Sequence, residues 1–349
     1  MIRGLGLAIV AITSAHAQWT LQQSHTSASL RGIHNVGNGV VWASGTQGTV
    51  LHTTNDGQTW QTCAVPPGAE QLDFRGIQAF DANTAVVMSS GTGALSRLYK
   101  TIDGCRTWKL VFTNPDQNGF WDAIQFASST FGALIGDQVD GHFPVFLSMD
   151  AGDSWQKLDP KATPAANKNQ SFFAASNTSL LVDAKNATLY MITGGGTTSM
   201  ITIDLHSPAR PHASSAQPEL ASGETAGGFS LASRMEGSNL VMVAVGGDYK
   251  APERTNGTAA YWIGQWRASA VPPNGYRSAV AYYAPGKAWI TVGPNGTDIS
   301  TDDGRNWHAL KPTVNEPRDA DKSWNALSLP FAAGPNGRIG KLNANAFKP

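Results

Sequence analysis

The sequence has little charge and no excess of either sign. Only 14% of its 349 residues are charged, and its 25 basic side chains are matched by 25 acidic ones. Proteins that bind nucleic acids or acidic membranes usually carry a basic excess. The composition therefore predicts neither kind of partner.

Long apolar runs are also missing. Beyond the first residues, no stretch has the roughly 18 to 20 uncharged apolar residues that a membrane-spanning helix needs. Residues 1–17 have the features of a signal peptide, namely a positive charge at Arg3, a short apolar run and a small-x-small site before Gln18. We expect a mature, soluble chain of residues 18–349 that is exported, either to the periplasm or by secretion.

Cysteine is scarce, since the chain contains only Cys63 and Cys105. Export makes a disulfide permissible, and a lone pair of thiols in an oxidising compartment tends to oxidise where geometry allows. We expect these two residues to pair. The alternative is two separate buried thiols.

Helix-forming residues are modest in number, whereas turn formers and tryptophan are abundant. The chain has 37 Gly, 19 Pro and 11 Trp. This balance is typical of an all-β protein with many turns rather than of a helical one.

Four copies of one short motif reveal an internal repeat. They read TTNDGQTW (53–60), TIDGCRTW (101–108), SMDAGDSW (148–155) and STDDGRNW (300–307). Their tryptophans are 48, 47 and 152 residues apart. The last interval is about three repeats long, so we expect two units with degraded motifs inside it.

Seven units follow one pattern of short strands. Each opens with Leu or an aromatic residue, continues with a second apolar strand that ends at Gly, and shows no helical periodicity. Seven such units predict a seven-bladed β-propeller with four antiparallel strands per blade. Two separate β-sandwiches would not explain a repeat that keeps its phase along the chain. The predicted openings are Leu30, Phe74, Trp121, Phe173, Phe229, Tyr276 and Trp324.

The ends of the chain predict how the ring closes. The seventh unit has room for only three strands, and residues 18–24 precede the first unit without a partner. We expect this amino-terminal strand to complete the last blade, so that no sheet edge or blade interface at the junction is left open.

The repeated motif has the composition of a turn. Its Gly supplies a positive φ, its Asp accepts bonds from backbone amides, and its Trp buries a ring in the next strand. A catalytic acid has no need to recur in four blades, so we assign the motif a structural role. The residues concerned are Asn55, Trp60, Asp103, Trp108, Asp150, Trp155, Asp302 and Trp307.

The motifs match the Asp-box (bacterial neuraminidase) repeat, with departures at Asn55 and Cys105. Together with the stretches LRGI, DFRGI, GYRSAVAYY and GPNGTDISTDDGRNW, they resemble the photosystem II stability/assembly factor family, in its exported bacterial branch. The resemblance covers essentially the whole mature chain. It implies a seven-bladed propeller that acts by binding protein partners, with the Asp-boxes on the rim and away from the central site. It does not imply photosynthesis.

Propeller ligands usually lie at the mouth of the central channel, beside the innermost strands. In a closed ring, residues that follow the openings come from adjacent blades and form a positive arc. We predict that this arc binds a carboxylate, a phosphate or an acidic segment of a protein partner, because guanidinium groups pair with planar anions. Alternatively, each Arg is paired with an acid such as Asp73 and only holds the ring together. The predicted binding residues are Arg31, Arg75, Asp122, Arg277 and Asn325.

A second hypothesis is a glycoside hydrolase of the sialidase type, or a carbohydrate-binding propeller. Hydrolysis requires two acids facing one bond. The candidate acids are Asp137, Asp140, Glu224 and Asp248, and the rings that would stack on a sugar are those of Trp121, Tyr276 and Trp324. Asp137, Asp140 and His142 are spaced closely enough to hold a metal, but a loop rich in Gly and Asp is more often only a turn.

The first hypothesis is therefore an exported, non-catalytic propeller. We expect it to be monomeric and to bind a protein partner or a small anionic ligand, without a metal or another cofactor.

Overall fold

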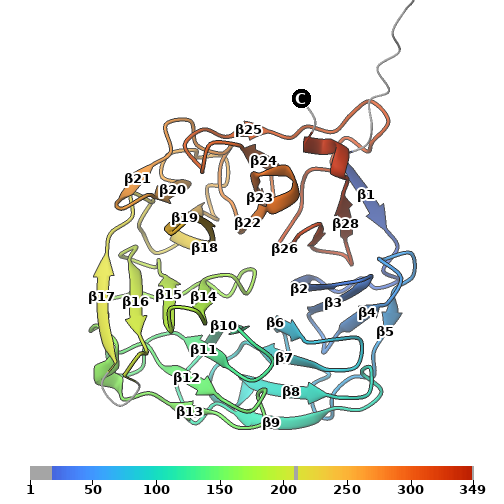
Figure 1. Cartoon of the computed structure of the whole chain (residues 1–349). Helices are drawn as coiled ribbons and strands as arrows, with labels where there is room; N and C mark the ends of the chain where they lie inside the picture. The colour runs from blue at the N-terminus through green and yellow to red at the C-terminus, as the bar shows by residue number, and fades with distance from the viewer. Residues whose placement is uncertain (1–17, 208–210, 348–349) are drawn as a thin grey trace, which may run out of the picture.

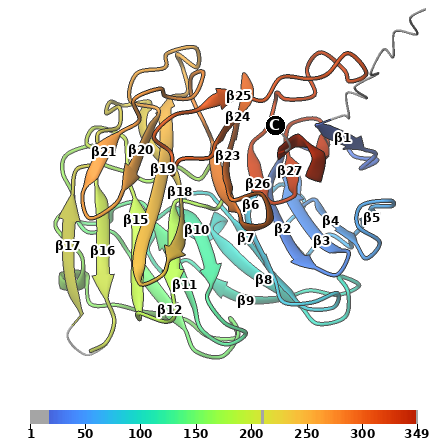
Figure 2. The same ribbon diagram turned by 45° about the horizontal axis from the view of Figure 1, so that its top comes forward.

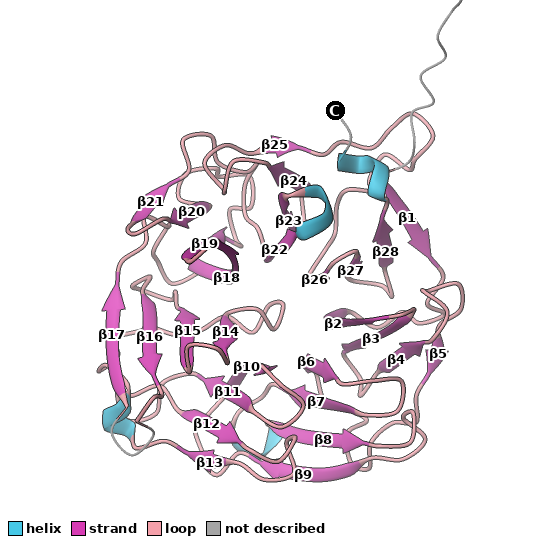
Figure 3. Ribbon diagram, viewed as in Figure 1, coloured by secondary structure: helices cyan, strands magenta, loops and turns pink. Residues whose placement is uncertain are grey.

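Seven four-stranded antiparallel sheets surround one centre (Figure 1). The computed structural model describes residues 18–207 and 211–347. Residues 1–17, where the sequence predicts a signal peptide, lie outside the described part of the chain. Regular structure in the described part is strand apart from four short 3₁₀ helices (Figure 3). The predicted seven-bladed β-propeller is confirmed.

Blades one to three take their strands in chain order, and the first strand of each faces the centre (Figure 1). Blade one consists of β2 (Leu30–Gly37), β3 (Val40–Gly45), β4 (Val50–Thr53) and β5 (Gln61–Thr62). Blade two consists of β6 (Phe74–Ala79), β7 (Ala85–Ser89), β8 (Arg97–Thr101) and β9 (Lys109–Thr113). Blade three consists of β10 (Trp121–Phe126), β11 (Gly132–Gly136), β12 (Val145–Ser148) and β13 (Gln156–Lys157).

Blades four to six are built in the same way. Blade four consists of β14 (Leu180–Asp183), β15 (Thr188–Ile192), β16 (Met200–Asp204) and β17 (His212–Ala216). Blade five consists of β18 (Ala226–Glu236), β19 (Asn239–Asp248), β20 (Ala259–Trp262) and β21 (Trp266–Ala268). Blade six consists of β22 (Ala279–Tyr283), β23 (Ala288–Gly293), β24 (Gly296–Ser300) and β25 (His308–Ala309). The 3₁₀ helices are η1 (Gly93–Leu95), η2 (Pro160–Ala162), η3 (Ala284–Gly286) and η4 (Ala344–Phe347).

Blade seven is completed by the amino-terminal strand, as predicted. It contains β26 (Ala326–Ser328), β27 (Phe331–Ala333), β28 (Ile339–Leu342) and β1 (Trp19–Gln22). Strand β1 pairs antiparallel with β28, and Trp19 lies opposite Leu342. Both ends of the described chain therefore meet at one blade (Figures 1 and 2). This pairing gives blade seven four strands, as in the other six blades, and closes the ring.

The hydrophobic core is divided among the interfaces between blades. Seven clusters of buried side chains each join two neighbouring blades. In one of them Trp42 of blade one packs with Phe74 and Tyr99 of blade two. In another, Trp19 and Trp324 of blade seven lie 5.0 Å apart between ring centroids. Apolar burial thus fastens each blade to the next, and all seven interfaces contribute to closure.

The predicted disulfide is present. Cys63 follows the last strand of blade one, and Cys105 lies in the turn between β8 and β9 of blade two. The bond links residues 42 positions apart and reinforces the first interface between blades.

Blade four starts later than the sequence predicts. Its first strand begins at Leu180 rather than at Phe173, and residues 171–179 form an irregular segment that reaches toward the centre of the ring (Figure 1). The opening assigned to Phe173 was therefore wrong as a strand start, because that part of the chain extends toward the centre before β14 begins.

Candidate functional site

Three polar side chains enter the centre of the ring from β-bulges. Near the start of β2, β6 and β10, the register with the neighbouring strand skips Arg31, Arg75 and Asp122 respectively. A bulge adds one residue to a strand and redirects its side chain. Because β2, β6 and β10 are innermost strands of adjacent blades, the three bulges follow one another around the centre, and Arg75 lies within electrostatic range of both Arg31 and Asp122.

Arg31 is half-buried, and it forms neither an ion pair nor a hydrogen bond within the described residues. Its Nε is buried without a partner. Burial and the positive charge of Arg75 lower the pKa of Arg31, whereas Asp73 and Tyr276 oppose that shift. Removing a guanidinium from water without giving it a hydrogen-bond partner costs free energy. An anion bound at this position would supply the missing partner.

Arg75 is already neutralised. Its Nε lies 2.8 Å from Asp73 Oδ2, and its Nη1 donates to the carbonyl of Ala174 at 3.2 Å. For Arg75, the alternative prediction is therefore confirmed: it is paired with a nearby acid, Asp73. Of the bulge arginines, Arg31 alone therefore has an unneutralised charge.

The carboxylate of Asp122 is buried, and the half-buried Asp137 and the guanidinium of Arg75 both lie within electrostatic range of it. Asp122 is 1% exposed, and its Oδ2 has no hydrogen-bond partner among the described residues. Burial and the charge of Asp137 raise the pKa of Asp122 well above its usual value, while Arg75 opposes the rise. Burial raises the pKa of Asp137 from 3.8 to about 6, although its Oδ1 accepts the amide of Phe172 at 2.9 Å. The side chain of Asp122, which the sequence predicted to bind a ligand, is thus enclosed in the protein.

We expect Asp137→Asn to stabilise the protein at pH 8 and to have little effect near pH 4. The folded wild type favours protonated Asp137. The stability that it gains from this proton is fully present below about pH 4 and is lost as the pH rises through about 6. At pH 8 the wild type therefore carries a penalty on the order of 2 to 3 kcal/mol, which a neutral amide avoids. The amide oxygen still accepts from Phe172. Urea unfolding of both proteins at pH 8 and pH 4 measures the difference in the free energy of unfolding; equal differences at both values would contradict the prediction.

Residues 171–179 cross the centre and connect blades that are not neighbours in the ring. Ser176 Oγ donates to the carbonyl of Ser278 at 2.7 Å, which joins the segment to blade six. Asn177 Oδ1 accepts the amide of Ile124 at 2.8 Å, which joins it to blade three. These bonds anchor the irregular segment to blades three and six.

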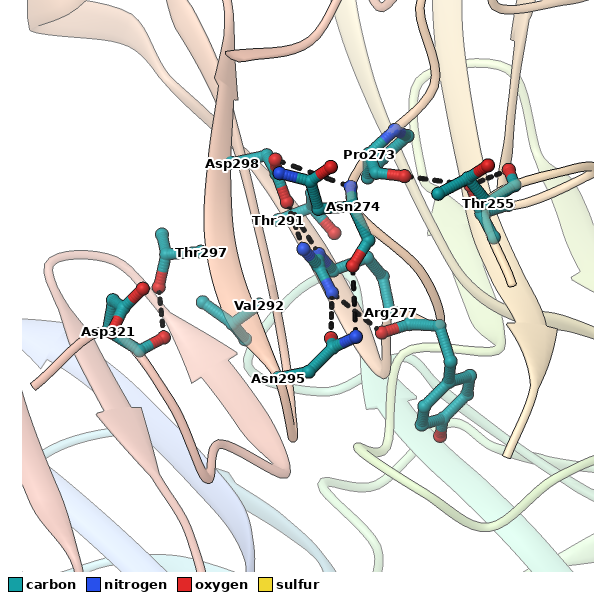
Figure 4. Close-up of polar contacts among 12 residues, drawn as sticks. Thr255, Pro273, Asn274, Arg277, Thr291, Val292, Asn295, Thr297, Asp298 and Asp321 are labelled. Carbon is teal, nitrogen blue, oxygen red and sulfur yellow. Dashed lines mark hydrogen bonds and ion pairs between the residues drawn. The ribbon is translucent and has the colours of Figure 1, made fainter. Parts of the chain in front are cut away.

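Arg277 lies outside this cluster, and its predicted place in the arc was wrong. The strand β22 begins two residues later without a register shift, and the Arg277 side chain turns into blade six (Figure 4). Its Nε donates to Asp298 Oδ2 at 2.7 Å, and Nη1 donates to the carbonyl of Tyr276 at 2.9 Å. Arg277 is 0% exposed and Asp298 1% exposed, so the pair is structural.

Asn325 and the predicted sugar-binding rings are also engaged in the fold. Asn325 Nδ2 donates to the carbonyl of Leu30 at 2.8 Å and links blade seven to blade one. The rings of Trp121, Tyr276 and Trp324 are 0%, 7% and 1% exposed. A sugar would not find an open face on any of the three.

The carboxylates proposed for hydrolysis are not brought together as a pair. Asp140 and Glu224 are exposed, and Asp140 has a φ of 51° in a turn. Asp248 accepts from Thr225 Oγ1 at 2.7 Å, and this bond is the main cause that lowers its pKa. Within residues 18–207 and 211–347, no hydrogen bond or ion pair joins any two of the four candidates, and no group of three metal-binding side chains is present.

The four repeated motifs form one hydrogen-bonded turn, each between the third and fourth strands of a blade. In blade three, Ser148 Oγ donates to Asp150 Oδ1 at 2.9 Å, and Oγ accepts the amide of Gly152 at 2.8 Å. Asp150 also accepts the amide and hydroxyl of Ser154, which lower its pKa to about 2. The bonds of the first hydroxyl and of the two backbone amides recur around Asn55, Asp103 and Asp302, whereas Asn55 Nδ2 donates to Thr59 Oγ1.

Two hollows lie away from the centre. One of about 580 Å³ is lined by Lys311, Arg318 and Lys322 among others. Another of about 860 Å³ lies on the outer side of blades three and four, where Met149 is exposed. Arg277 also lines the first hollow, whereas neither hollow is lined by Arg31 or Arg75.

Solved structures share this architecture. "YCF48 bound to D1 peptide" is 15% identical, with a TM-score of 0.60, over 94% of this chain and 97% of that chain. YCF48 from Cyanidioschyzon merolae is 15% identical, with a TM-score of 0.63, over 94% and 99%. A GH74 xyloglucanase from Xanthomonas campestris is 15% identical, with a TM-score of 0.63, over 95% of this chain but 54% of that chain. At such identities the likeness shows the fold alone.

Comparison with family models and with curated protein sequences finds no match. Within the described residues, no helix is long and apolar enough to cross a membrane.

Sequence reasoning found the bulge residues but missed their surroundings. The glycine that follows each arginine, Gly32 and Gly76, is a feature of the sequence from which the bulges are predictable. A Cβ at Gly32 would lie 2.6 Å from Ser44 Oγ, and one at Gly76 would lie 2.8 Å from Asn177 Oδ1. The recurring Arg-Gly-Ile therefore marks a bulge with close packing behind it. No comparable local signal indicated that Asp137 lies within electrostatic range of Asp122, or that Tyr249 lies near Tyr276.

Proposed function

We propose that the protein is an exported, non-catalytic propeller that binds a carboxylate group of a protein partner at Arg31. The observation that supports this most directly is the half-buried guanidinium of Arg31, which has no partner among the described residues. Charge-assisted hydrogen bonds to a carboxylate would satisfy its donors. The fold likeness to YCF48 bound to a D1 peptide supports a peptide as the partner.

Export, a monomeric state and membership of the exported Asp-box branch remain proposals. They rest on the amino-terminal residues and on the repeated motifs. The glycoside hydrolase alternative receives less support, because the candidate acids are separate and the candidate rings are buried.

We expect Arg31→Ala to weaken peptide binding by about tenfold or more, since a hydrogen-bonded charge contributes roughly 1.5 to 3 kcal/mol. The probes are three fluorescein-labelled peptide pools: one with a free C-terminal carboxylate, one with an internal Asp or Glu and an amidated end, and one with neither. Fluorescence polarisation gives the Kd for each pool. The exposed Arg106→Ala on the rim is the matched control. If no pool binds, or if Arg31→Ala binds all pools as the wild type does, the proposed function is wrong.

A further inference from the structure

One buried carboxylate holds the backbone at the start of β1. Glu316 lies in the connection between β25 of blade six and β26 of blade seven, and it is 9% exposed. Its Oε1 accepts the amide of Gln18 at 2.8 Å and that of Trp19 at 2.6 Å, while its Oε2 accepts the amide of Thr313 at 2.7 Å. A single side chain therefore fixes the two residues with which the described chain begins.

This carboxylate has no counter-charge among the described residues. Burial opposes the ionisation of Glu316, but the amides of Thr313, Gln18 and Trp19 outweigh that effect and lower its pKa, so it is charged at neutral pH. Within residues 18–207 and 211–347, no lysine, arginine or histidine forms an ion pair with it. A buried charge without an opposite charge has a desolvation cost, which a cation in contact with it would offset.

The other charged side chains near Glu316 do not supply this cation. Glu316 lines the hollow of about 580 Å³, and the charged residues that share it are Arg277, Lys311, Arg318, Asp321 and Lys322. Arg277 is already paired with Asp298, and the other three basic side chains are exposed and are not paired with Glu316. The place beside Glu316 Oε1 is occupied instead by the backbone nitrogens of Gln18 and Trp19.

Processing of the amino terminus would create the missing cation at one of these nitrogens. The small-x-small site predicts cleavage between Ala17 and Gln18. A peptidase of the export route adds one water across this peptide bond, which leaves a carboxylate on Ala17 and an α-ammonium group on Gln18. The nitrogen that changes from a neutral amide to a cation with three donors is the one 2.8 Å from Glu316 Oε1. The motif and the geometry therefore point to the same atom.

We propose that removal of residues 1–17 places the free α-ammonium group of Gln18 on the carboxylate of Glu316, and that this ion pair fastens the closing strand of the ring. The inference rests on export, which is part of the proposed function. The carbonyl of Gln18 accepts the amide of Asn343 at 2.8 Å, and Trp19 is 2% exposed, so the position of the ammonium group is fixed by its neighbours. An unprocessed chain has only a neutral amide there, so blade seven is held more tightly after processing.

The test compares two purified chains, one that begins at Gln18 and one with a single Met before it, each as wild type and as Glu316→Gln. The variant keeps an oxygen for the backbone amides and loses the charge. An amine-reactive ester acylates freshly released chains, whose Gln18 has not cyclised, between about pH 6 and pH 10, and mass spectrometry gives the rate at the terminal amine. The wild-type amine of Gln18 should titrate near pH 9 or above, and that of Glu316→Gln near pH 8. At pH 7 the wild type should therefore react about tenfold more slowly.

The ion pair should also contribute to stability. Below about pH 8, the ordinary pKa of an α-amine, Glu316→Gln should lower the Tm of the chain that begins at Gln18 by about 2 to 4 °C more than the Tm of the Met-extended chain. This difference should disappear as the pH rises through the raised pKa of the folded amine, because the folded state then loses the proton. The exposed Glu219→Gln is the matched control and should change neither the acylation rate nor the Tm.

The outcomes separate the possible failures. If the wild-type amine titrates near pH 8, or if both chains respond equally to Glu316→Gln, the ion pair is wrong, and peptide binding at Arg31 is unaffected. If the peptide assay fails while the amine titrates near pH 9, the binding function is wrong and the ion pair stands. Expression of the full chain in an exporting bacterium, with mass spectrometry of the product, checks the cleavage. A product that begins at another residue, or no exported product, overturns the inference.

Discussion

Replacing Asp298 by Ala should lower the free energy of unfolding by about 3 to 5 kcal/mol, because it removes the carboxylate that is hydrogen-bonded to the buried guanidinium of Arg277. Both side chains are almost completely enclosed, and Arg277 bonds to Asp298 through Nε and Nη2. A charge in such a position cannot be rehydrated without opening blade six. For a chain of this length, the loss corresponds to a Tm lower by about 5 °C.

A surface ion pair provides the control. Arg338 lies 3.5 Å from Asp319, whose side chain is 62% exposed, so Asp319→Ala should cost less than about 1 kcal/mol. The double variant Arg277→Met with Asp298→Ala removes both charges and should recover much of the loss. Urea unfolding measures all three. Equal effects of Asp298→Ala and Asp319→Ala would show that Arg277 finds water or another partner.

Removing the disulfide should have an effect of similar size. Cys63 and Cys105 close a loop of 42 residues, and chain entropy alone predicts about 4 kcal/mol for a loop of this length, or a Tm lower by about 6 °C. The bond joins blade one to blade two at the rim, where their shared hydrophobic cluster ends. Loss of the bond should therefore loosen this interface first.

Calorimetry of the wild type with and without reductant, beside the Cys63→Ser and Cys105→Ser double variant, checks this. The reduced wild type and the double variant should melt together, below the oxidised protein. Reductant should leave the double variant unchanged. An oxidised protein that melts with the double variant would contradict a stabilising bond.

The fold was predictable from the sequence because every blade packs against its two neighbours in the same way. Each must bury one face against the previous blade and one against the next, so similar residues recur near each opening, such as Leu30, Phe74 and Trp121. The closing role of residues 18–24 followed from counting strands. Repetition of this kind is visible in a single sequence.

The site was predictable only in part, because neighbours in the sequence do not determine where a side chain goes. Arg31 and Arg277 both follow a blade opening, yet one enters the centre from a bulge and the other pairs with Asp298. That difference depends on strand register and on an acid 21 residues away. The path of residues 171–179 toward the centre was not predictable for a similar reason, since their hydrogen-bond partners Ile124 and Ser278 belong to other blades.

The pairing of β1 with β28 also sets an order of assembly. Trp19 and Leu342 come from opposite ends of the described chain, so this contact forms only after nearly all of the chain between them is in place. Contacts at such sequence separation are slow to form. Until then β28 presents an unpaired edge, which is able to accept a first strand from another copy. Delayed closure at high protein concentration would therefore yield strand-exchanged dimers, in which β1 of each copy pairs with β28 of the other.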